Sequence, residues 1–409
     1  MPNRMLKLIC IFIMLSGSVW AQQPRAGHLA NLIADIRDAM PGRDSYAYIA
    51  PTSAQRDSFE LIINKILNEN YAGADSIASN LNYVLYEYTD TGSGNRTYYV
   101  LMEENADKED SIKLGWGTYI FDPAGSDKAV IEIPHPMFDT NTWLVGISAY
   151  QALDSKFFLM AGTHRYANGS NPAPADVAHN TSNIFHLVHC KIASHSDHTV
   201  QIHGYSRSTR EEYAAYPDAI ISNGTSSPSA ILDSLDEAIE DEGYTCGIFN
   251  GVDYAYLGAT TNKQGQFSNS NGYSFVHMEL EYFIRSSQDE WTNIIDALNN
   301  VFLLGTALKS IAGKQILIDF YLGDNYPNPF NPQTVIPFYL NDNQHIQMHI
   351  YNDLGQHLTT LVTGQLQPGY HEIIWNGRDS RGNAVASGHY YYVMITNDQT
   401  HTKSMILLR

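Results

Sequence analysis

The sequence is short of cysteine, of positive charge and of long apolar runs. It has 24 lysine and arginine residues against 43 acidic residues, and its formal net charge of −19 argues against binding to nucleic acid or to anionic membrane surfaces. Beyond the N-terminus no apolar run is long enough to span a bilayer, so we expect no stable membrane insertion. Outside the N-terminal segment only Cys190 and Cys246 remain; they can form one disulfide or stay free, and neither is expected to be a nucleophile.

The first 21 residues have the pattern of a secretory signal peptide. Arg4 and Lys7 supply the positive start, and residues 8–15 (LICIFIML) form an apolar core that is too short to cross a bilayer. Val-Trp-Ala at 19–21 places small residues at the two positions that a signal peptidase inspects. We therefore expect signal peptide 1–21 to be removed and the mature protein to be exported.

Behind the signal peptide, apolar patterns predict an α/β domain over residues 22–320. Apolar stripes at helical spacing alternate with β-branched and aromatic runs, which is typical of a mixed, largely parallel sheet flanked by helices. Expected helices cover 27–40, 53–82, 142–154, 180–193, 229–242 and 290–308, and expected strands cover 83–88, 97–102, 115–121, 130–133, 157–161, 199–203, 246–249 and 272–281.

A change in composition marks a second domain. Three prolines within residues 321–333 cannot continue a helix or a central strand, and they predict a linker. After it, short strands with Asn-Gly and Arg-Gly turns predict a small all-β immunoglobulin-like sandwich over 334–409. Its strands are expected at 334–340, 345–351, 357–361, 369–375, 389–395 and 402–408.

This tail resembles the C-terminal sorting domain of the type IX secretion system. The resemblance rests on four motifs in order: YPNPFNPQTVI (326–336), IYNDLGQHLTTL (350–361), WNGRDSRGNAVASGHYYYVM (375–394) and TKSMILLR (402–409). It implies that the type IX secretion machinery is a partner, and that the protein passes through the periplasm to the cell surface or the medium.

Three buried strand-like runs of the first domain each lead into a histidine. His135 follows the run at 130–133, His164 follows the run at 157–161, and His203 ends the next expected strand. Because ligands bind at the carboxyl ends of strands in open α/β sheets, we expect one site at one edge of the sheet.

The residue types at this edge predict a hydrolytic zinc site. Such a site needs about three protein ligands and an open position for water. His135, Asp139 and His203 supply the imidazole and carboxylate groups that suit Zn²⁺. Arg165 offers a planar fork of donors for a substrate carboxylate or a developing oxyanion. A carboxylate general base is needed as well.

The same segments resemble the zinc carboxypeptidases and the related N-formylglutamate amidohydrolases. The resemblance rests on IEIPHPMFD (131–139), AGTHRYAN (161–168), TVQIHGYS (199–206) and YSFVHMELE (273–281). It implies a zinc-exopeptidase-like fold, with His135 and His203 as histidine ligands and Glu279 as the general base. The carboxypeptidase motif places its glutamate ligand three residues after the first histidine, whereas Asp139 follows four residues after it, so coordination by Asp139 is left open.

Together these patterns predict a secreted, zinc-dependent amidohydrolase or carboxypeptidase that cleaves an amide bond in a peptide, an acyl-amino acid or a cell-wall fragment. Two alternatives are open: a non-catalytic surface protein that binds a ligand on the same fold, and another metal-dependent hydrolase such as an esterase or a phosphatase. Alternation along a strand puts Glu279 and Glu281 on the same face, so alternation alone does not choose the base.

Overall fold

The computed structural model describes residues 24–109, 111, 113–171, 173–303, 320–323, 325, 327–340, 343–367, 369–396 and 400–409. The signal peptide expected at 1–21 and the end of the helix expected at 290–308 lie outside these residues. Among the described helices, none is both long and apolar enough to cross a membrane.

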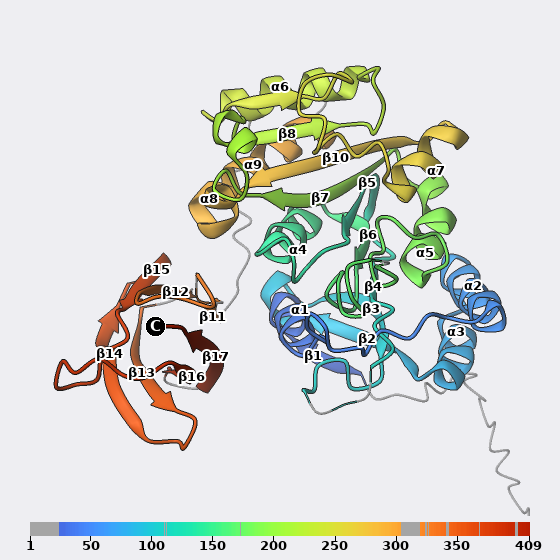
Figure 1. The fold of residues 1–409 in the computed structure, drawn as a ribbon. Coiled ribbons are helices and arrows are strands. Elements are labelled where there is room, and N and C mark those ends of the chain that lie inside the picture. The colour runs from blue at the N-terminus through green and yellow to red at the C-terminus, as the bar shows by residue number, and fades with distance from the viewer. Residues whose placement is uncertain are drawn as a thin grey trace, which may run out of the picture.

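The first part of the chain forms one large mixed sheet (Figure 1). In spatial order its strands are β1 Arg25–Gly27, β2 Tyr83–Asp90, β3 Arg96–Glu103, β4 Thr118–Phe121, β6 Ser155–Met160, β5 Ser126–Ile133, β7 His198–Tyr205, β10 Ser274–Glu281, β8 Ala219–Ser222 and β9 Cys246–Ile248. The central strands β6, β5, β7 and β10 are parallel, whereas β2, β3, β4 and β6 pair antiparallel, as do β10 and β8. The expected mixed α/β sheet is therefore present, with its parallel part at the centre.

Helices cover both faces of this sheet (Figure 1). One apolar core is built with α1 Leu29–Asp38, α4 Thr142–Ala152, α6 Ala230–Asp241, α8 Tyr282–Ser286 and α9 Gln288–Phe302. The second is built with α2 Ser53–Leu67, α3 Tyr71–Ala78 and α5 Ile184–Ile192, and α7 Lys263–Asn271 packs on α5 and β10. Short 3₁₀ turns lie at Ser79–Leu81, Thr91–Ser93, Ala193–His195 and Glu211–Ala215.

Capping groups explain where the helices differ from expectation. The helix expected over 53–82 is divided because the side chain of Asn70 accepts the Gly73 N–H at 3.0 Å and starts α3. In the same way Asn183 accepts the His186 N–H at 2.7 Å and delays the start of α5 to Ile184. Four helices and strands of this domain were not expected. They are the short elements β1, β8 and α8, and α7, whose sequence KQGQFSNSN has almost no apolar periodicity.

Toward their carboxyl ends, β5, β7 and β10 carry apolar side chains on one face and polar side chains on the other. Ile131, Ile133, Val200, Ile202, Val276, Met278 and Leu280 point into the core formed with α4 and α9. Alternation turns Glu132, Gln201, His203, His277 and Glu279 to the opposite face. Strand pairing then puts Glu132 and His277 on either side of Gln201, and Glu279 beside His203.

The chain leaves two neighbouring central strands in opposite directions. After β5 it runs to α4 on one face, and after β6 it runs to α5 on the other. Such a switch point opens a crevice at the carboxyl ends of the strands, which is where α/β sheets bind ligands.

The tail folds into two antiparallel sheets that share one core. The first contains β11 Phe320–Leu322, β12 Thr334–Leu340 and β15 Gly369–Trp375; the second contains β14 His357–Leu366, β13 Gln344–Asn352, β16 Gly388–Ile395 and β17 Thr400–Leu407. The expected β domain is confirmed, and β11 is an addition to it. The segment expected as a linker also contributes to this core, because Leu322 and Phe330 are buried in it.

Candidate metal centre

A single backbone turn joins the first two expected ligands. His135 follows β5, and the N–H of Asp139 donates to the carbonyl of His135 at 3.0 Å. The hydroxyl of Thr142 donates to the carbonyl of Asp139 at 2.8 Å and fixes the end of this turn at the start of α4. One helical turn brings side chains at i and i+4 to the same side. Asp139 follows His135 by four residues, and for this reason its carboxylate lies beside the His135 imidazole.

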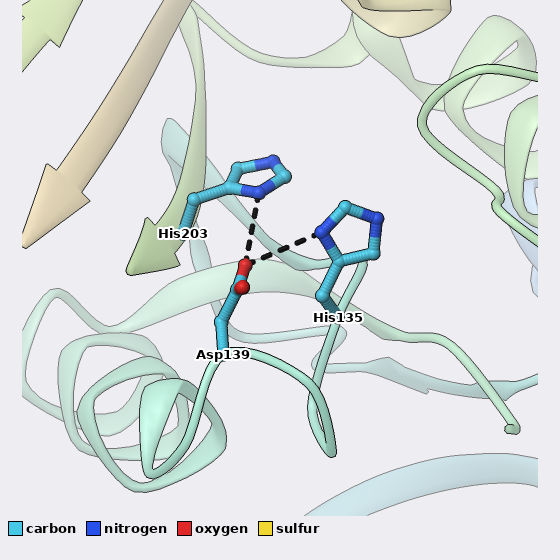
Figure 2. A group of neighbouring side chains, drawn as sticks. All are labelled: His135, Asp139 and His203. Carbon is cyan, nitrogen blue, oxygen red and sulfur yellow. Dashed lines mark hydrogen bonds and ion pairs between the residues drawn. The ribbon is translucent and has the colours of Figure 1, made fainter. Parts of the chain in front are cut away.

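The third expected ligand approaches the same carboxylate from β7. Asp139 Oδ2 lies 3.2 Å from His135 Nδ1 and 3.1 Å from His203 Nδ1, as Figure 2 shows. His203 was expected at the end of its strand. It lies inside β7 instead, because this strand continues to Tyr205. The structure nevertheless brings all three predicted ligands together, and all three are buried.

Two of the three ligand-atom separations in this trio suit a small tetrahedral metal ion. In a tetrahedral zinc site with bonds of about 2.0–2.1 Å, the ligand atoms are about 3.3 Å apart. The two nitrogen–oxygen distances of 3.1 and 3.2 Å are close to that separation. Two imidazole nitrogens and one carboxylate oxygen are also a donor set that zinc accepts.

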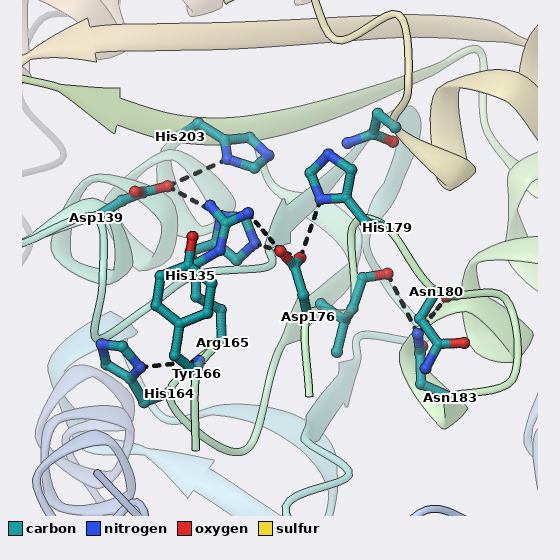
Figure 3. Close-up of polar contacts among 12 residues, drawn as sticks. His135, Asp139, His164, Arg165, Tyr166, Asp176, His179, Asn180, Asn183 and His203 are labelled. Carbon is teal, nitrogen blue, oxygen red and sulfur yellow. Dashed lines mark hydrogen bonds and ion pairs between the residues drawn. The ribbon is translucent and has the colours of Figure 1, made fainter. Parts of the chain in front are cut away.

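Both histidines are held by their outer nitrogens, and Figure 3 shows the contact of His135 with Asp176. His135 Nε2 lies 3.0 Å from Asp176 Oδ1, and His203 Nε2 lies 2.9 Å from Gln201 Oε1. Metal-binding histidines commonly donate their second N–H in this way, which fixes ring orientation and tautomer. Sequence reasoning missed Asp176, because it lies in a loop without periodicity. It missed Gln201 as well, since this residue reads as part of a buried strand.

Asp139 and the two histidines shift one another's pKa values. Burial opposes ionisation of this carboxyl, but hydrogen bonds and attraction from the two histidines outweigh it and lower its pKa. Burial lowers the pKa of His203 to about 4, even though Asp139 acts in the other direction. Burial and Arg165 also oppose protonation of His135, yet Asp176 and Asp139 together raise its pKa.

The guanidinium of Arg165 lies beside His135 and already contacts other side chains of the protein. Its guanidinium forms an ion pair with Asp176, and Nη1 lies 3.4 Å from His135 Nδ1. It also stacks 5.1 Å from the ring centroids of both Phe138 and Tyr166. Its Nε is buried and has no hydrogen-bond partner among the described residues. The expected role in binding substrate stays a prediction.

The two carboxylates of β10 have different surroundings. Glu279 is paired in register with His203 and lies 3.6 Å from His277 Nε2, and these three residues form a second group that could hold a metal ion. Burial and Asp139 raise the pKa of Glu279 well above its ordinary value. Glu281 instead accepts the backbone N–H groups of Phe283 and Arg207, at 2.7 and 3.0 Å, and caps α8.

One buried guanidinium ties together the segments that carry the site. Arg285 donates to three backbone carbonyls: to Leu280 at 3.0 Å, to Tyr205 at 2.9 Å and to Thr140. Each carbonyl follows a site residue by one or two positions. A Cβ at Gly204 would overlap the Arg285 guanidinium, so β7 needs glycine there.

A cavity of about 420 Å³ is lined in part by Asp176. Its walls are Ala173, Pro174, Asp176, His179, Asn180, Thr181 and Lys263. This volume falls in the ordinary range for small-molecule sites.

The remaining candidates have structural surroundings. Cys190 and Cys246 are both free, so the alternative of a disulfide between them is contradicted. Cys190 lies 3.5 Å from His186 Nε2 on the same helix, and burial raises its pKa to about 12. His195 is exposed. His164 contacts Phe138 and Tyr166 rather than the candidate ligands.

In the comparison with protein families, the match lies in the tail. The family described as the FlgD Ig-like domain matches residues 332–400, and no curated protein matches the chain. This match agrees with the antiparallel sheets observed there.

Similarity to solved structures is distant. A "putative metallopeptidase" from Shewanella amazonensis is 11% identical with a TM-score of 0.29, over 62% of this chain and 95% of that chain. PorU from Porphyromonas gingivalis is 16% identical with a TM-score of 0.20, over 25% of this chain. PorZ of the same organism, a surface component of the type IX secretion system, is 23% identical with a TM-score of 0.16, over 22% of this chain. This chain spans 10% of PorU and 11% of PorZ, and none of these TM-scores supports a conclusion about function.

Proposed function

We propose that this protein is an exported zinc-dependent hydrolase that cleaves an amide bond, of the amidohydrolase or carboxypeptidase type and with a zinc-exopeptidase-like fold. One observation carries the proposal: Asp139 Oδ2 lies between the Nδ1 atoms of His135 and His203, with the buried carboxyl of Glu279 in register beside His203. A site for a bound ligand alone does not need a buried carboxyl at this position, which favours catalysis over the ligand-binding alternative.

The residues divide the work as follows. His135, Asp139 and His203 would hold the zinc ion, which when bound would supply Lewis-acid activation of a water molecule and of the substrate carbonyl. Glu279 takes the proton of the attacking water and returns it to the leaving amine. Arg165 Nε, which lacks a partner among the described residues, donates to the developing oxyanion.

The cavity beside Asp176 is the proposed substrate pocket. Its size suits a short peptide, an acyl-amino acid or a cell-wall fragment, and Lys263 and His179 in its wall suit a carboxylate on that substrate. The tail, with its resemblance to a sorting domain and its match to an immunoglobulin-like family, is proposed to direct the protein through the type IX machinery to the cell surface or medium.

Elemental analysis of two variants tests the metal centre. We expect one zinc ion per chain in the wild type, loss of zinc in His203→Ala, and full zinc in His195→Ala, whose imidazole is exposed and remote. The proposal is wrong if the wild type purified with zinc present contains none, or if His203→Ala retains a full equivalent.

A further inference from the structure

The turn that joins two of the candidate metal ligands presents an exposed aromatic ring. Phe138 lies between His135 and Asp139 in the chain and is 42% exposed, whereas both of these neighbours are buried. Its ring centroid lies 5.7 Å from that of His164 and 5.3 Å from that of Tyr166, with the ring planes at 77° and 76°. Edge-to-face contacts at these distances stabilise aromatic pairs. Phe138, His164 and Tyr166 thus form one cluster, the aromatic rim.

Backbone hydrogen bonds hold this rim in place. The N–H of Tyr166 donates to His164 Nδ1 at 3.0 Å. The N–H of Asp44 donates to the carbonyl of Tyr166 at 3.0 Å, and the N–H of Tyr46 donates to the carbonyl of Ala167 at 2.8 Å. Asp44 and Tyr46 have φ angles of 54° and 56°, a left-handed conformation that costs free energy outside glycine and persists only where the surroundings impose it. The rim is therefore a pre-formed surface.

Two guanidinium groups lie against the rim. Arg165 lies 5.1 Å from the ring centroids of both Phe138 and Tyr166, and Arg43 lies 5.4 Å from that of Tyr166. Such contacts are attractive, because the face of an aromatic ring carries partial negative charge. His164 and Tyr166 are half-buried, so Phe138 is the exposed member of the rim. A ligand that reaches the rim therefore contacts chiefly Phe138.

The position of Arg165 relates the rim to the substrate. In the proposed reaction Arg165 faces the oxyanion, which forms from the carbonyl oxygen of the scissile amide. The acyl substituent is one bond away from that carbonyl carbon. Because Arg165 also lies against Phe138 and Tyr166, this substituent is placed at the rim. The cavity with Lys263 in its wall contains none of the three rings, and it is left for the part of the substrate that carries the carboxylate.

We propose that Phe138 is a specificity-determining residue, and that the aromatic rim binds an aromatic or large apolar acyl group. The substrate class is then an N-acyl amino acid or a short peptide that carries such a group on the acyl side of the scissile bond. This inference rests on the proposed function for the direction in which the substrate lies. A substrate ring buries apolar area against Phe138 and adds an aromatic pair, whereas an acetyl group offers only one methyl group.

Two small compounds test this preference. N-benzoylglycine and N-acetylglycine share the amide and the carboxylate and differ only in the acyl group. Both are titrated by NMR into the metal-free full chain, in which metal-dependent hydrolysis cannot consume them. We expect the wild type to bind N-benzoylglycine roughly 10- to 100-fold more tightly than N-acetylglycine.

Three variants assign the preference to the ring. Phe138→Ala should bring the ratio of the two affinities below about 3, because the aromatic pair and most of the buried area are lost. Phe138→Tyr keeps a ring in the same turn and should keep the preference, which separates loss of the ring from damage to the fold. Leu61→Ala is the control, because Leu61 is 54% exposed on α2 and lies outside the rim; its ratio should equal that of the wild type.

Equal affinities for the two compounds in the wild type, absence of binding included, would overturn the inference. A preference that survives in Phe138→Ala would overturn it as well. If the preference depends on Phe138 but the zinc-loaded wild type hydrolyses neither compound, the result counts against the proposed hydrolase and leaves the binding role of Phe138 intact. Hydrolysis of both compounds with equal kcat/KM and no difference in affinity would support the hydrolase and refute the role of Phe138.

Discussion

The two carboxylates of β10 share one face of the strand, but their neighbours give them separate tasks. Glu279 is buried among His203 and His277, whereas both oxygens of Glu281 are used by backbone N–H groups. We therefore expect Glu279→Gln to keep zinc and to reduce turnover by roughly 10²- to 10⁴-fold, the usual contribution of a positioned proton acceptor. Turnover is measured on a substrate found by screening the wild type, alongside zinc content.

Glu281→Gln is the matched control for that experiment. Its amide oxygen can still accept one backbone N–H, so a small loss of thermal stability and near-normal turnover are expected. The reverse ranking would assign the base to Glu281, and normal turnover in both variants would refute a carboxylate base on β10.

His186 is expected to make stability depend on pH. Burial lowers its pKa to about 4, with further repulsion from His189, Arg56 and Lys263. In the unfolded chain its pKa is about 6.5, so between pH 4 and 6.5 the unfolded state binds more protons and stability falls as the pH falls. Relative to His186→Gln, which does not titrate, the wild type should lose about 1–2 kcal/mol of unfolding free energy between pH 7 and pH 5.

Urea unfolding of the two proteins at pH 7 and pH 5 measures this difference, since each protein serves as its own reference for effects of other groups. Parallel loss of stability in wild type and variant would show that His186 is already accessible to protons in the folded state.

The elements that carry the site are joined by Arg285 on α8. Its three donors reach carbonyls after Asp139, His203 and Glu279, so one side chain links the β5–α4 turn, β7 and β10. Lysine keeps the charge but cannot serve three carbonyls in a plane. We expect Arg285→Lys to lower the unfolding free energy by about 2–4 kcal/mol, and Arg210→Lys, at an exposed position, to change it by less than about 0.5 kcal/mol.

Gly204→Ala offers an independent check, because its methyl group would occupy the space of the same guanidinium. The two substitutions disturb one contact, so their costs should not add in the double variant. Additive costs, or an Arg285→Lys protein as stable as the wild type, would show that this contact does not hold the elements together.

Some residues of the candidate site could be predicted from sequence patterns, and others could not. His135 and His203 were accessible because each follows a run of β-branched residues, and strand ends meet at one edge of a sheet. Asp176 was not, since a loop residue is positioned by tertiary contacts that leave no periodicity. Glu132 and Gln201 occupy strand positions that read as core, and only the packing of α5 and α7 shows that this face is polar.

The division of the whole chain can be tested with fragments chosen from the packing. Residues 321–333 were expected to be a linker, yet Leu322 and Phe330 are buried in the core of the tail, and β11 pairs with β12. A cut after residue 303 leaves that core intact, whereas a cut before residue 327 removes β11 from it. We expect the fragment 24–303 to fold and to bind zinc with the stoichiometry of the full chain.

Two tail fragments form the matched pair. The fragment 320–409 retains the burial of Leu322, while 327–409 loses it together with the backbone pairing of β11. Removal of a buried leucine side chain alone costs about 2–5 kcal/mol, so 327–409 should unfold at clearly lower denaturant than 320–409. Equal midpoints would return residues 320–326 to the role of a linker. If 24–303 is molten and regains structure only when 320–409 is added, then the two parts do not fold independently, and the tail supports the metal domain directly.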